Sequence, residues 1–432
     1  MEYAEALDHL ESLINYEVTP RAGRIEGLKL DHMRELVAAM GDPQVSYPVI
    51  HVTGTNGKGS TVRMIEALAA TMGLRVGAYS SPHLETPNER IRVNGEPIDD
   101  DDFGQVIGSV ARVAEIQGLE PVTWFETVTA AGLLHFADEA VDLAVVEVGM
   151  LGRFDATNVV DGAVSVVTNV GLDHTDGLGE WQRAIAREKA GILRAGRPLV
   201  LGEPDESLRG EFLAENPDPV RVRDIDFGVV SDQLAVGGRL LELRTSRGLR
   251  DEVFVALHGA HQADNAVVAL AAAEEFFDVA LPDDVVEEAF ASVAVPGRLE
   301  VVARTPLVVL DAAHNVPGAE ALADTLAHDF GEGQRRYMVL GMQDGRDPAA
   351  LCRALGVSAA ELVVACTAPT ARGIPASEVA AAVESVGGSA EAVADVTAAV
   401  ERARSLAGEE DLVVVVGSAT VVGAARSVLV GL

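Results

Sequence analysis

The segment VIHVTGTNGKGSTV, residues 49–62, has the residue types needed to hold a phosphate group. Its glycines can present backbone N–H groups to phosphate oxygens, Lys58 adds a compact positive charge, and Ser60 can face a phosphate or its magnesium ion. The spacing departs from the usual G-x-x-x-x-G-K-[ST], because Val52 occupies the first glycine position and Gly59 separates Lys58 from Ser60. Alone, the segment fits a variant phosphate loop or a tight turn between a strand and a helix.

Polar side chains that could complete such a site follow other apolar runs. Glu147 lies near the end of VDLAVVEV (141–148), and Asp173 and His174 follow AVSVVTN (163–169). Ligands of open parallel sheets bind at the carboxyl ends of strands, so these side chains are candidates for one crevice. Oxygen ligands with one imidazole suit Mg²⁺, a hard cation. The alternatives are a salt-bridged glutamate at a strand end and an ordinary polar histidine.

Lysine is rare in this chain. The chain has thirty arginines but only three lysines, Lys29, Lys58 and Lys189. A lysine in such a chain is a candidate for a role that needs a compact charge or an amine that can lose its proton. Lys189 lies in WQRAIAREKAGILRAG, which has the pattern of a helix, and a surface ion pair is its alternative role.

A second group of polar residues occurs late in the chain. Asp311, His314 and Asn315 follow the apolar run LVVL, and Arg298 lies in the preceding PGR segment. These side chains could reach a nucleotide held between two domains, although an ordinary turn at a strand end would have the same pattern.

The elements that must position these residues alternate along the chain. Apolar runs of strand length are mostly followed by helical spacing, which predicts a mostly parallel sheet with helices on both faces. Residues 205–258 are less regular and predict short antiparallel strands, and an alanine-rich helix is expected at 262–277. The predicted parallel strands are 48–53, 74–79, 141–148, 163–169 and 198–201.

Pro296 and Gly297 interrupt the segment VAVPGRLEVV and predict a boundary. Strand and helix patterns then alternate again through PLVVLDAAHN, RRYMVLG, ELVVACT and LVVVVGS. We therefore predict two α/β domains, residues 1–296 and 297–432. The run DDDD at 99–102 is expected to cap a helix rather than to form a site.

The net charge of −34 argues against a general binder of nucleic acid or anionic membranes. Cys352 and Cys366 are too few for a disulfide framework, and the acidic N-terminus lacks the order of a signal peptide. The apolar run 412–425 is too short to span a bilayer and reads as strand, turn and helix start. A cytoplasmic protein is expected.

Nine segments occur in one order over nearly the whole chain: HVTGTNGKGS, SSPHL, NERIRVNG, EVGMLGRFDATN, GLDHTDGLG, EKAGI, GAHQADNA, PGRLEV and LDAAHN. Together they resemble the folylpolyglutamate synthase and dihydrofolate synthase family of the Mur ligase superfamily. The resemblance implies an α/β fold: a P-loop ATPase domain with a mostly parallel sheet, and a smaller C-terminal Rossmann-like domain. The active site is expected between them.

The resemblance also implies the reaction, a ligation driven by ATP with Mg²⁺ as cofactor. ATP phosphorylates a carboxylate, and the amino group of L-glutamate then displaces phosphate from the acyl phosphate. The implied partners are small molecules: ATP, L-glutamate, and dihydropteroate or a reduced folate. No nucleic-acid or membrane partner is implied, and a monomer is expected.

Residue by residue, the resemblance implies these roles. The ATP site would comprise Asn56, Gly57, Lys58, Gly59, Ser60, Asn265, Arg298, Asp311 and His314. The magnesium ligands would be Ser81, Glu147 and His174. The pteroyl group would lie against Thr123, Trp124, Phe125, Glu126, Phe154, Asp155 and Ala156. The implied catalytic residues are Lys58, His174 and Lys189, with Lys189 carried as a carbamate.

The chain departs from the family pattern E-V-G-x-G-G-R-L-D at two positions. Leu151 replaces a glycine and Phe154 replaces the leucine, and both are expected to flank the pterin pocket. A Mur-type ligase acting on another carboxylate is one alternative function, although SSPHL and NERIRVNG favour the folate branch. A nucleotide-binding regulator without ligase activity is the other, and it is disfavoured by the presence of Lys58, Glu147, His174 and Lys189.

Overall fold

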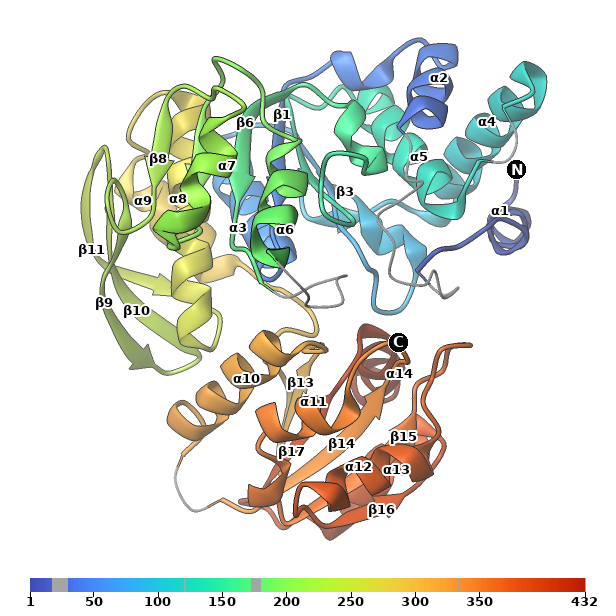
Figure 1. The fold of residues 1–432 in the computed structure, drawn as a ribbon, viewed down its shortest axis with the longest axis vertical. Helices are drawn as coiled ribbons and strands as arrows, with labels where there is room; N and C mark the ends of the chain where they lie inside the picture. Colours follow the sequence, from blue (N-terminus) through green and yellow to red (C-terminus); the bar gives the residue numbers. More distant parts are fainter. Residues whose placement is uncertain (18–29, 120–121, 172–179, 332–333, 432) are drawn as a thin grey trace.

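The computed structural model describes residues 1–17, 30–119, 122–171, 180–331 and 334–431. Figure 1 shows two α/β units, an N-terminal unit coloured blue to yellow and a C-terminal unit coloured orange to red below it. The N-terminal unit contains the large sheet and a small antiparallel sheet, and the C-terminal unit has its own six-stranded sheet. The predicted fold class is confirmed.

The large sheet has eight strands in the order β4-β3-β2-β5-β1-β6-β7-β8. Six of them, from β2 to β8 in that order, pair in parallel, while β3 and β4 form an antiparallel edge. The strands are β1 (Val49–Thr53), β2 (Val76–Tyr79), β3 (Ile91–Val93), β4 (Glu96–Pro97), β5 (Leu143–Glu147), β6 (Gly162–Val167), β7 (Leu199–Leu201) and β8 (Val220–Val222). The predicted parallel strands are thus present.

Helices cover both faces of this sheet, because its central strands are buried on both sides and need apolar cover. One face packs against α3 (Lys58–Thr71), α8 (Ala260–Phe277) and α9 (Asp283–Ser292). The other face packs against α1 (Tyr3–Ser12), α2 (Asp31–Ala39), α4 (Asp100–Gln117), α5 (Trp124–Asp138), α6 (Trp181–Ala190) and α7 (Arg209–Leu213). Asp99 caps α4 by accepting a hydrogen bond from the Asp102 N–H, as the acidic run predicts.

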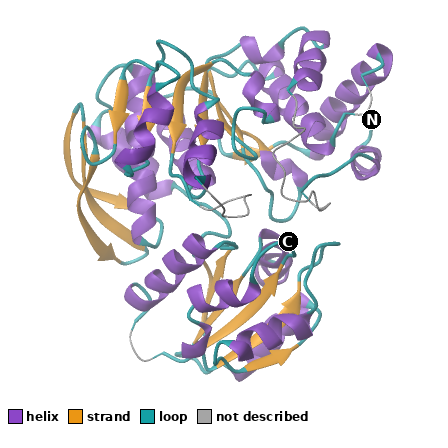
Figure 2. Cartoon of the chain, in the orientation of Figure 1, coloured by secondary structure: helices purple, strands orange, loops and turns teal. Residues whose placement is uncertain are grey.

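The small sheet contains β9 (Gly228–Ala235), β10 (Gly238–Thr245) and β11 (Gly248–Val255), paired antiparallel in the order β11-β10-β9. It packs against α8 and α9 at the side of the N-terminal unit and appears as the orange strands at the left of Figure 2. The prediction of antiparallel strands for residues 205–258 is confirmed for 228–255 and is wrong for the start of that range, where α7 and the parallel strand β8 lie. In the part of the chain that the structure covers, no helix has the length and apolar character needed to cross a membrane.

The C-terminal sheet has the order β12-β13-β17-β14-β15-β16, parallel except for the β12–β13 pair. Its strands are β12 (Glu300–Arg304), β13 (Leu307–Asp311), β14 (Arg336–Met342), β15 (Leu362–Thr367), β16 (Ala390–Ala392) and β17 (Leu412–Val416). One face is covered by α10 (Val316–His328), α11 (Pro348–Ala354) and α12 (Ala376–Ser385), and the other by α13 (Val396–Leu406) and α14 (Ala419–Val430). The run 412–425 is therefore strand, turn and helix start, as predicted.

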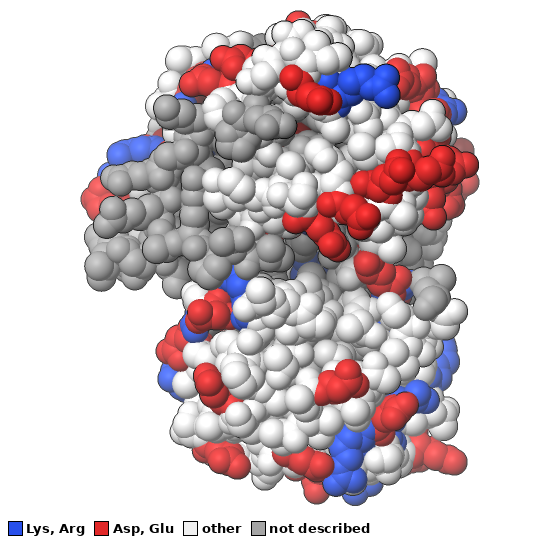
Figure 3. Space-filling model, turned by 90° about the vertical axis from the view of Figure 1, so that its right-hand side faces the viewer, with Lys and Arg blue, Asp and Glu red and all other residues white. Residues whose placement is uncertain are grey.

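Ion pairs join the two units. Arg239 on β10 donates to both carboxylate oxygens of Asp329, which follows α10, at 3.0 and 2.9 Å. Arg426 on α14 lies 3.3 Å from Glu85 of the N-terminal unit and 3.1 Å from Glu300. Acidic side chains spread over both units on the face shown in Figure 3, in keeping with the strongly negative net charge.

The buried ion pair between β11 and α8 generates a stability prediction. Arg250 lies 2.7 Å from Glu274, and both side chains are almost fully buried. Arg250→Ala would leave a buried carboxylate without its counter-charge, so we expect the free energy of unfolding to fall by about 3–5 kcal/mol. Urea unfolding followed by circular dichroism measures the change. Arg402→Ala, which breaks the solvent-exposed pair with Glu391, is the control and should change little. Equal losses in the two variants would contradict the prediction.

Candidate active site

A cavity of about 970 Å³ lies where the carboxyl ends of the large sheet's strands face the C-terminal unit. Both units line it, and of the residues to which the family resemblance assigns a role it contains all but two. Lys189 is buried beside the cavity without lining it, and His174 lies outside the described residues. Of the other candidates, Asp173 also lies outside the described residues and Asn315 does not line the cavity. The lining residues with predicted roles are Asn56, Gly57, Lys58, Gly59, Ser60, Ser81, Thr123, Trp124, Phe125, Glu126, Glu147, Phe154, Asp155, Ala156, Asn265, Arg298, Asp311 and His314.

The glycine-rich loop connects β1 to the N-terminus of α3, the position that lets backbone N–H groups and the helix dipole face an anion. Gly57 has φ of +82°, and a Cβ atom there would lie 2.3 Å from the Asn265 side-chain oxygen. Asn169, at the end of β6, accepts hydrogen bonds from the N–H groups of Thr55 and Asn56 at 3.2 and 2.9 Å. The loop is thereby held between α8 and β6.

Lys58 and Glu147 give this part of the cavity its charge. The Lys58 ammonium donates to the carbonyl oxygens of Gly54 and Thr55, at 3.1 and 3.4 Å. Burial raises the pKa of the Glu147 carboxyl, while Lys58, the Ser81 N–H and Arg298 act in the opposite direction. The loop lysine is therefore close enough to act electrostatically on the strand-end carboxylate.

Ser81 and Glu147 form the described part of the predicted magnesium site. The Ser81 N–H donates to Glu147 Oε2 at 3.2 Å, and Glu147 is only 3% exposed. A Cβ atom at Gly59 would lie 3.5 Å from the same carboxylate oxygen, so the phosphate loop and this oxygen are adjacent. A buried carboxylate beside a hydroxyl suits Mg²⁺, which prefers oxygen ligands and would offset the cost of burying the charge. The residues present therefore fit this ion.

The C-terminal unit supplies the facing wall. Asp311 accepts hydrogen bonds from the N–H groups of Leu299 and Ala313 at 2.9 and 2.8 Å, and burial raises the pKa of its carboxyl. Asn315 caps α10 and donates to the Asn56 side-chain oxygen at 3.0 Å. This amide contact joins the phosphate loop directly to the C-terminal unit.

Aromatic and charged groups form the wall around Trp124. The Arg90 guanidinium lies 4.5 Å from the centroid of the Trp124 ring and pairs bidentately with Glu17 at 3.0 and 2.7 Å. Its Nε also donates to His83 Nδ1 at 2.9 Å. Burial and Arg90 lower the pKa of His83 to about 4, so the ring is neutral at neutral pH. Thr123 caps α5 and is bonded to Glu126, which fixes the start of this wall.

Phe154 and Leu151, the two departures from the family pattern, differ in their position relative to the cavity. Phe154 lines the cavity and is 41% exposed. Leu151 is buried, has φ of +60°, and accepts a hydrogen bond from the Thr53 hydroxyl at 2.6 Å through its carbonyl oxygen. Because it is not among the lining residues, the expectation that Leu151 flanks the pocket is not met. Only Phe154 is placed to alter the shape of the cavity.

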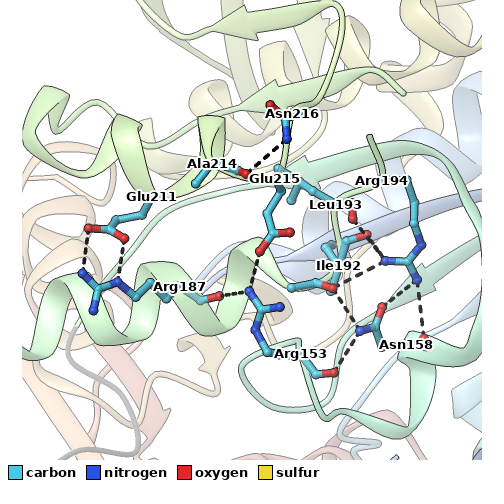
Figure 4. Close-up of polar contacts among 11 residues, drawn as sticks. Arg153, Asn158, Arg187, Ile192, Leu193, Arg194, Glu211, Ala214, Glu215 and Asn216 are labelled. Carbon is cyan, nitrogen blue, oxygen red and sulfur yellow. Dashed lines mark hydrogen bonds and ion pairs between the residues drawn. The ribbon is translucent and has the colours of Figure 1, made fainter. Parts of the chain in front are cut away.

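The loop that carries Phe154 is tied to α6, the helix of Lys189. The Arg153 N–H donates to the Glu188 carbonyl at 2.8 Å, and its guanidinium reaches Glu215 at 2.5 Å (Figure 4). A Cβ atom at Gly152 would lie 3.2 Å from Lys189 Cα, so the backbones are in close contact. Lys189 is thus buried against the loop that carries Phe154.

Several lining residues were not singled out from the sequence. The Glu17–Arg90 pair joins positions 73 residues apart, and neither residue lies at a predicted strand end. Asn169 is the last residue of the predicted strand 163–169, and its polar character at that end was an available signal. Gln262 accepts a hydrogen bond from Asn265 at 2.9 Å and lies within GAHQADNA, a segment already recognised as a motif.

Comparison with known proteins gives matches over both units. Residues 52–273 match the Mur ligase middle domain and residues 297–419 match the Mur ligase glutamate ligase domain. A dihydrofolate synthase/folylpolyglutamate synthase of Mycobacterium tuberculosis is 42% identical over 70% of this chain, and the match spans 66% of that relative. A solved folylpolyglutamate synthase of the same organism, complexed with ADP and AMPPCP, is 35% identical with a TM-score of 0.90 and covers 99% of both chains.

A further solved relative is described as a bifunctional folylpolyglutamate synthase/dihydrofolate synthase with Mn, AMPPNP and L-glutamate bound. It is 29% identical to this chain, with a TM-score of 0.85, and the match covers 99% of this chain and 98% of the relative.

The close approach of Gly57 to Asn265 generates a test of the phosphate loop. Gly57→Ala should displace the loop, because the added Cβ would clash with Asn265. We expect ATP binding to weaken by about tenfold or more, which corresponds to about 1.4 kcal/mol or more. ATP affinity is measured by calorimetric titration. Gly73→Ala is the matched control, since Gly73 has φ of +91° but no atom within 4 Å of the added Cβ. Both variants place alanine in a left-handed backbone, but only Gly57→Ala adds a clash, so equal ATP affinities would refute the loop geometry.

Proposed function

The chain belongs to the folylpolyglutamate synthase/dihydrofolate synthase branch of the Mur ligase family, and we propose that it ligates L-glutamate to both dihydropteroate and reduced folates. The reaction consumes ATP and requires a divalent metal, Mg²⁺ in the cell. The observation that carries the proposal is the single cavity in which the phosphate loop, the Glu147 carboxylate and the Trp124 wall meet. These parts supply a phosphate site, a metal ligand and an aromatic surface for a flat ring.

The first step activates a carboxylate, which is a poor electrophile because its leaving group would be an oxide. A carboxylate oxygen of the folate substrate bonds to the γ-phosphorus of ATP, the bond from that phosphorus to the β,γ-bridging oxygen breaks, and ADP leaves. Lys58 and the backbone N–H groups of the loop neutralise charge on the transferred group. Ser81 and Glu147 would hold Mg²⁺, which when bound would supply further neutralisation of the phosphate oxygens.

In the second step the neutral amino group of L-glutamate attacks the acyl carbon. An amide bond forms, the carbon–oxygen bond to phosphate breaks, and the nitrogen loses a proton. We propose that the two units meet between residues 296 and 297, and that both must be present because Asp311, Arg298 and His314 reach the cavity from beyond that boundary. The Asn56–Asn315 contact supports an active site shared by the two units.

Acceptance of both acceptor substrates follows from what they share. Dihydropteroate and reduced folates share a pterin joined to p-aminobenzoate and differ in the oxidation level of the ring and in the glutamate tail, so one aromatic wall can hold either. We also propose that the protein is a cytoplasmic monomer that serves folate biosynthesis and one-carbon metabolism. Cys352 and Cys366 are both buried free thiols, as suits a reducing compartment.

Separate incubations test the choice of substrate. Dihydropteroate and tetrahydrofolate are offered individually with ATP, Mg²⁺ and L-glutamate, and the products are identified by mass. We expect both acceptors to gain glutamate, with Lys58→Ala as the inactive control. Product from only one acceptor would restrict the enzyme to a single activity, and product from neither would refute the proposed function.

We further propose that Lys189 is carbamylated in the active enzyme. Its side chain is fully buried, and a carbamate forms when a neutral amine adds CO₂ and loses a proton, which converts a cation into an anion. Such an anion behind the metal site could orient the metal ligands, as groups around metal sites commonly do. Arginine cannot replace it, because its guanidinium stays protonated.

Lys189→Ala and Lys189→Arg should both reduce turnover by about tenfold to a hundredfold, the usual range for partners of metal ligands. Acetate or formate should partly restore the alanine variant by replacing the negative charge. Carbon-13 NMR of protein equilibrated with labelled bicarbonate should show a carbamate signal that Lys189→Arg lacks. Full activity of Lys189→Arg would end the carbamate hypothesis.

A further inference from the structure

Three potential metal ligands meet on two helices that pack against each other. Asp102 lies in the first turn of α4, His135 in the last turn of α5, and Glu139 is the residue that caps α5 at its C-terminus. One ligand atom of each lies within 4.8 Å of the other two. His135 and Glu139 are four residues apart, and Glu139 keeps helical backbone angles, so both side chains lie on one face of α5.

The His135 ring is a buried polar group that points to a ligand. The residue is 6% exposed, and its ring packs against Phe136 with centroids 6.5 Å apart. Within the described residues, none of the hydrogen bonds involves a ring nitrogen of His135. A largely buried imidazole whose nitrogens make no hydrogen bond to a described residue can offer one of those nitrogens to a bound cation.

The charges around the ring also favour a cation. Burial lowers the pKa of the His135 ring, while the carboxylates of Asp102, Asp138 and Asp99 act in the opposite direction and Arg75 adds to the lowering. Arg75 also pairs with Glu139, but its side chain is 45% exposed. An exposed ion pair of this kind contributes little to stability, so Arg75 can release Glu139 to an incoming ion at small cost.

We propose that Asp102, His135 and Glu139 form a second divalent-cation site, specific for transition-metal ions such as Zn²⁺. One imidazole nitrogen and two carboxylate oxygens are ligands typical of zinc, and water can complete the coordination. Mg²⁺ is a poor match, because it prefers oxygen ligands and strict octahedral geometry. The site would therefore discriminate against the ion required for ligation.

This site is separate from the active site. None of its three residues lines the cavity, and Arg75 immediately precedes β2, at the opposite end of that strand from Ser81. A bound ion would cross-link α4 to α5, and both helices cover the core on one face of the large sheet. The expected role is therefore structural, tightening a layer whose other contacts are mostly apolar.

Cobalt titration of the full chain tests the proposal, because Co²⁺ bound to nitrogen and oxygen ligands absorbs visible light. The parent carries Glu147→Gln, which weakens metal binding at the active site, and excess Mg²⁺ is present. We expect one Co²⁺ per chain and a rise in melting temperature with Zn²⁺. Adding His135→Gln removes one ligand of three, so it should weaken binding by about tenfold or more, equivalent to about 1.4 kcal/mol, and abolish the melting shift.

His328→Gln is the matched control. His328 likewise lies in the last turn of a helix, α10, but it is exposed and its ring bonds the Asp324 carbonyl at 2.7 Å. It should bind cobalt as the parent does. Asp102→Asn provides a second test should His135→Gln fail to fold, because Asp102 is half-buried and its loss spares the core. Unchanged cobalt binding in His135→Gln or Asp102→Asn, or no visible band in the parent, would overturn the proposal.

Discussion

The register of three parallel strands is the constraint on which the site depends. Val52 of β1 pairs with Glu147 of β5, and Thr53 of β1 pairs with Val167 of β6. The phosphate loop, the buried carboxylate and Asn169 therefore emerge side by side at one edge of the sheet. A slip of one residue in either pair would turn these side chains to the other face, so the apolar strands that fix the register also fix the chemistry.

The same arrangement places three buried carboxylates at the cavity. Buried carboxylates would ordinarily destabilise a fold. Burial raises the pKa of Glu147, Asp155 and Asp311, and backbone N–H groups donate to each of them. These donors offset part of the cost of burial and hold the oxygens in place. The cavity is thus preorganised for a cation and for phosphate groups, and this is what phosphoryl transfer requires from a protein.

Local patterns predicted the parts of the site that lie at strand ends. The glycine-rich loop, Glu147 and Asp311 all end buried runs, and their meeting in one cavity follows from parallel pairing. The resemblance to a known family predicted which further residues line the cavity, such as Thr123 and Ala156. The alternation of apolar strands and helices predicted the two α/β units for the same reason, because each apolar run needs cover on both faces.

Contacts between distant segments could not be predicted in this way. The Glu17–Arg90–Trp124 cluster depends on how the N-terminal segment crosses α5, and the burial of Leu151 depends on a left-handed turn with no local signature. The Asp102–His135 approach likewise depends on how α4 packs on α5. In each case tertiary packing decides which residues meet. Neither the spacing nor the types of the residues along the chain specify that packing.

Transfer of phosphate to the substrate carboxylate is the step on which the proposed function of this cavity depends. The most direct measurement follows the oxygen atoms of that carboxylate. A reduced folate labelled with oxygen-18 in the reacting carboxylate is converted with ATP and L-glutamate, and the released phosphate is analysed by mass spectrometry. An acyl phosphate intermediate predicts that each phosphate carries a single labelled oxygen atom from the substrate. Amide product accompanied by unlabelled phosphate would contradict the account.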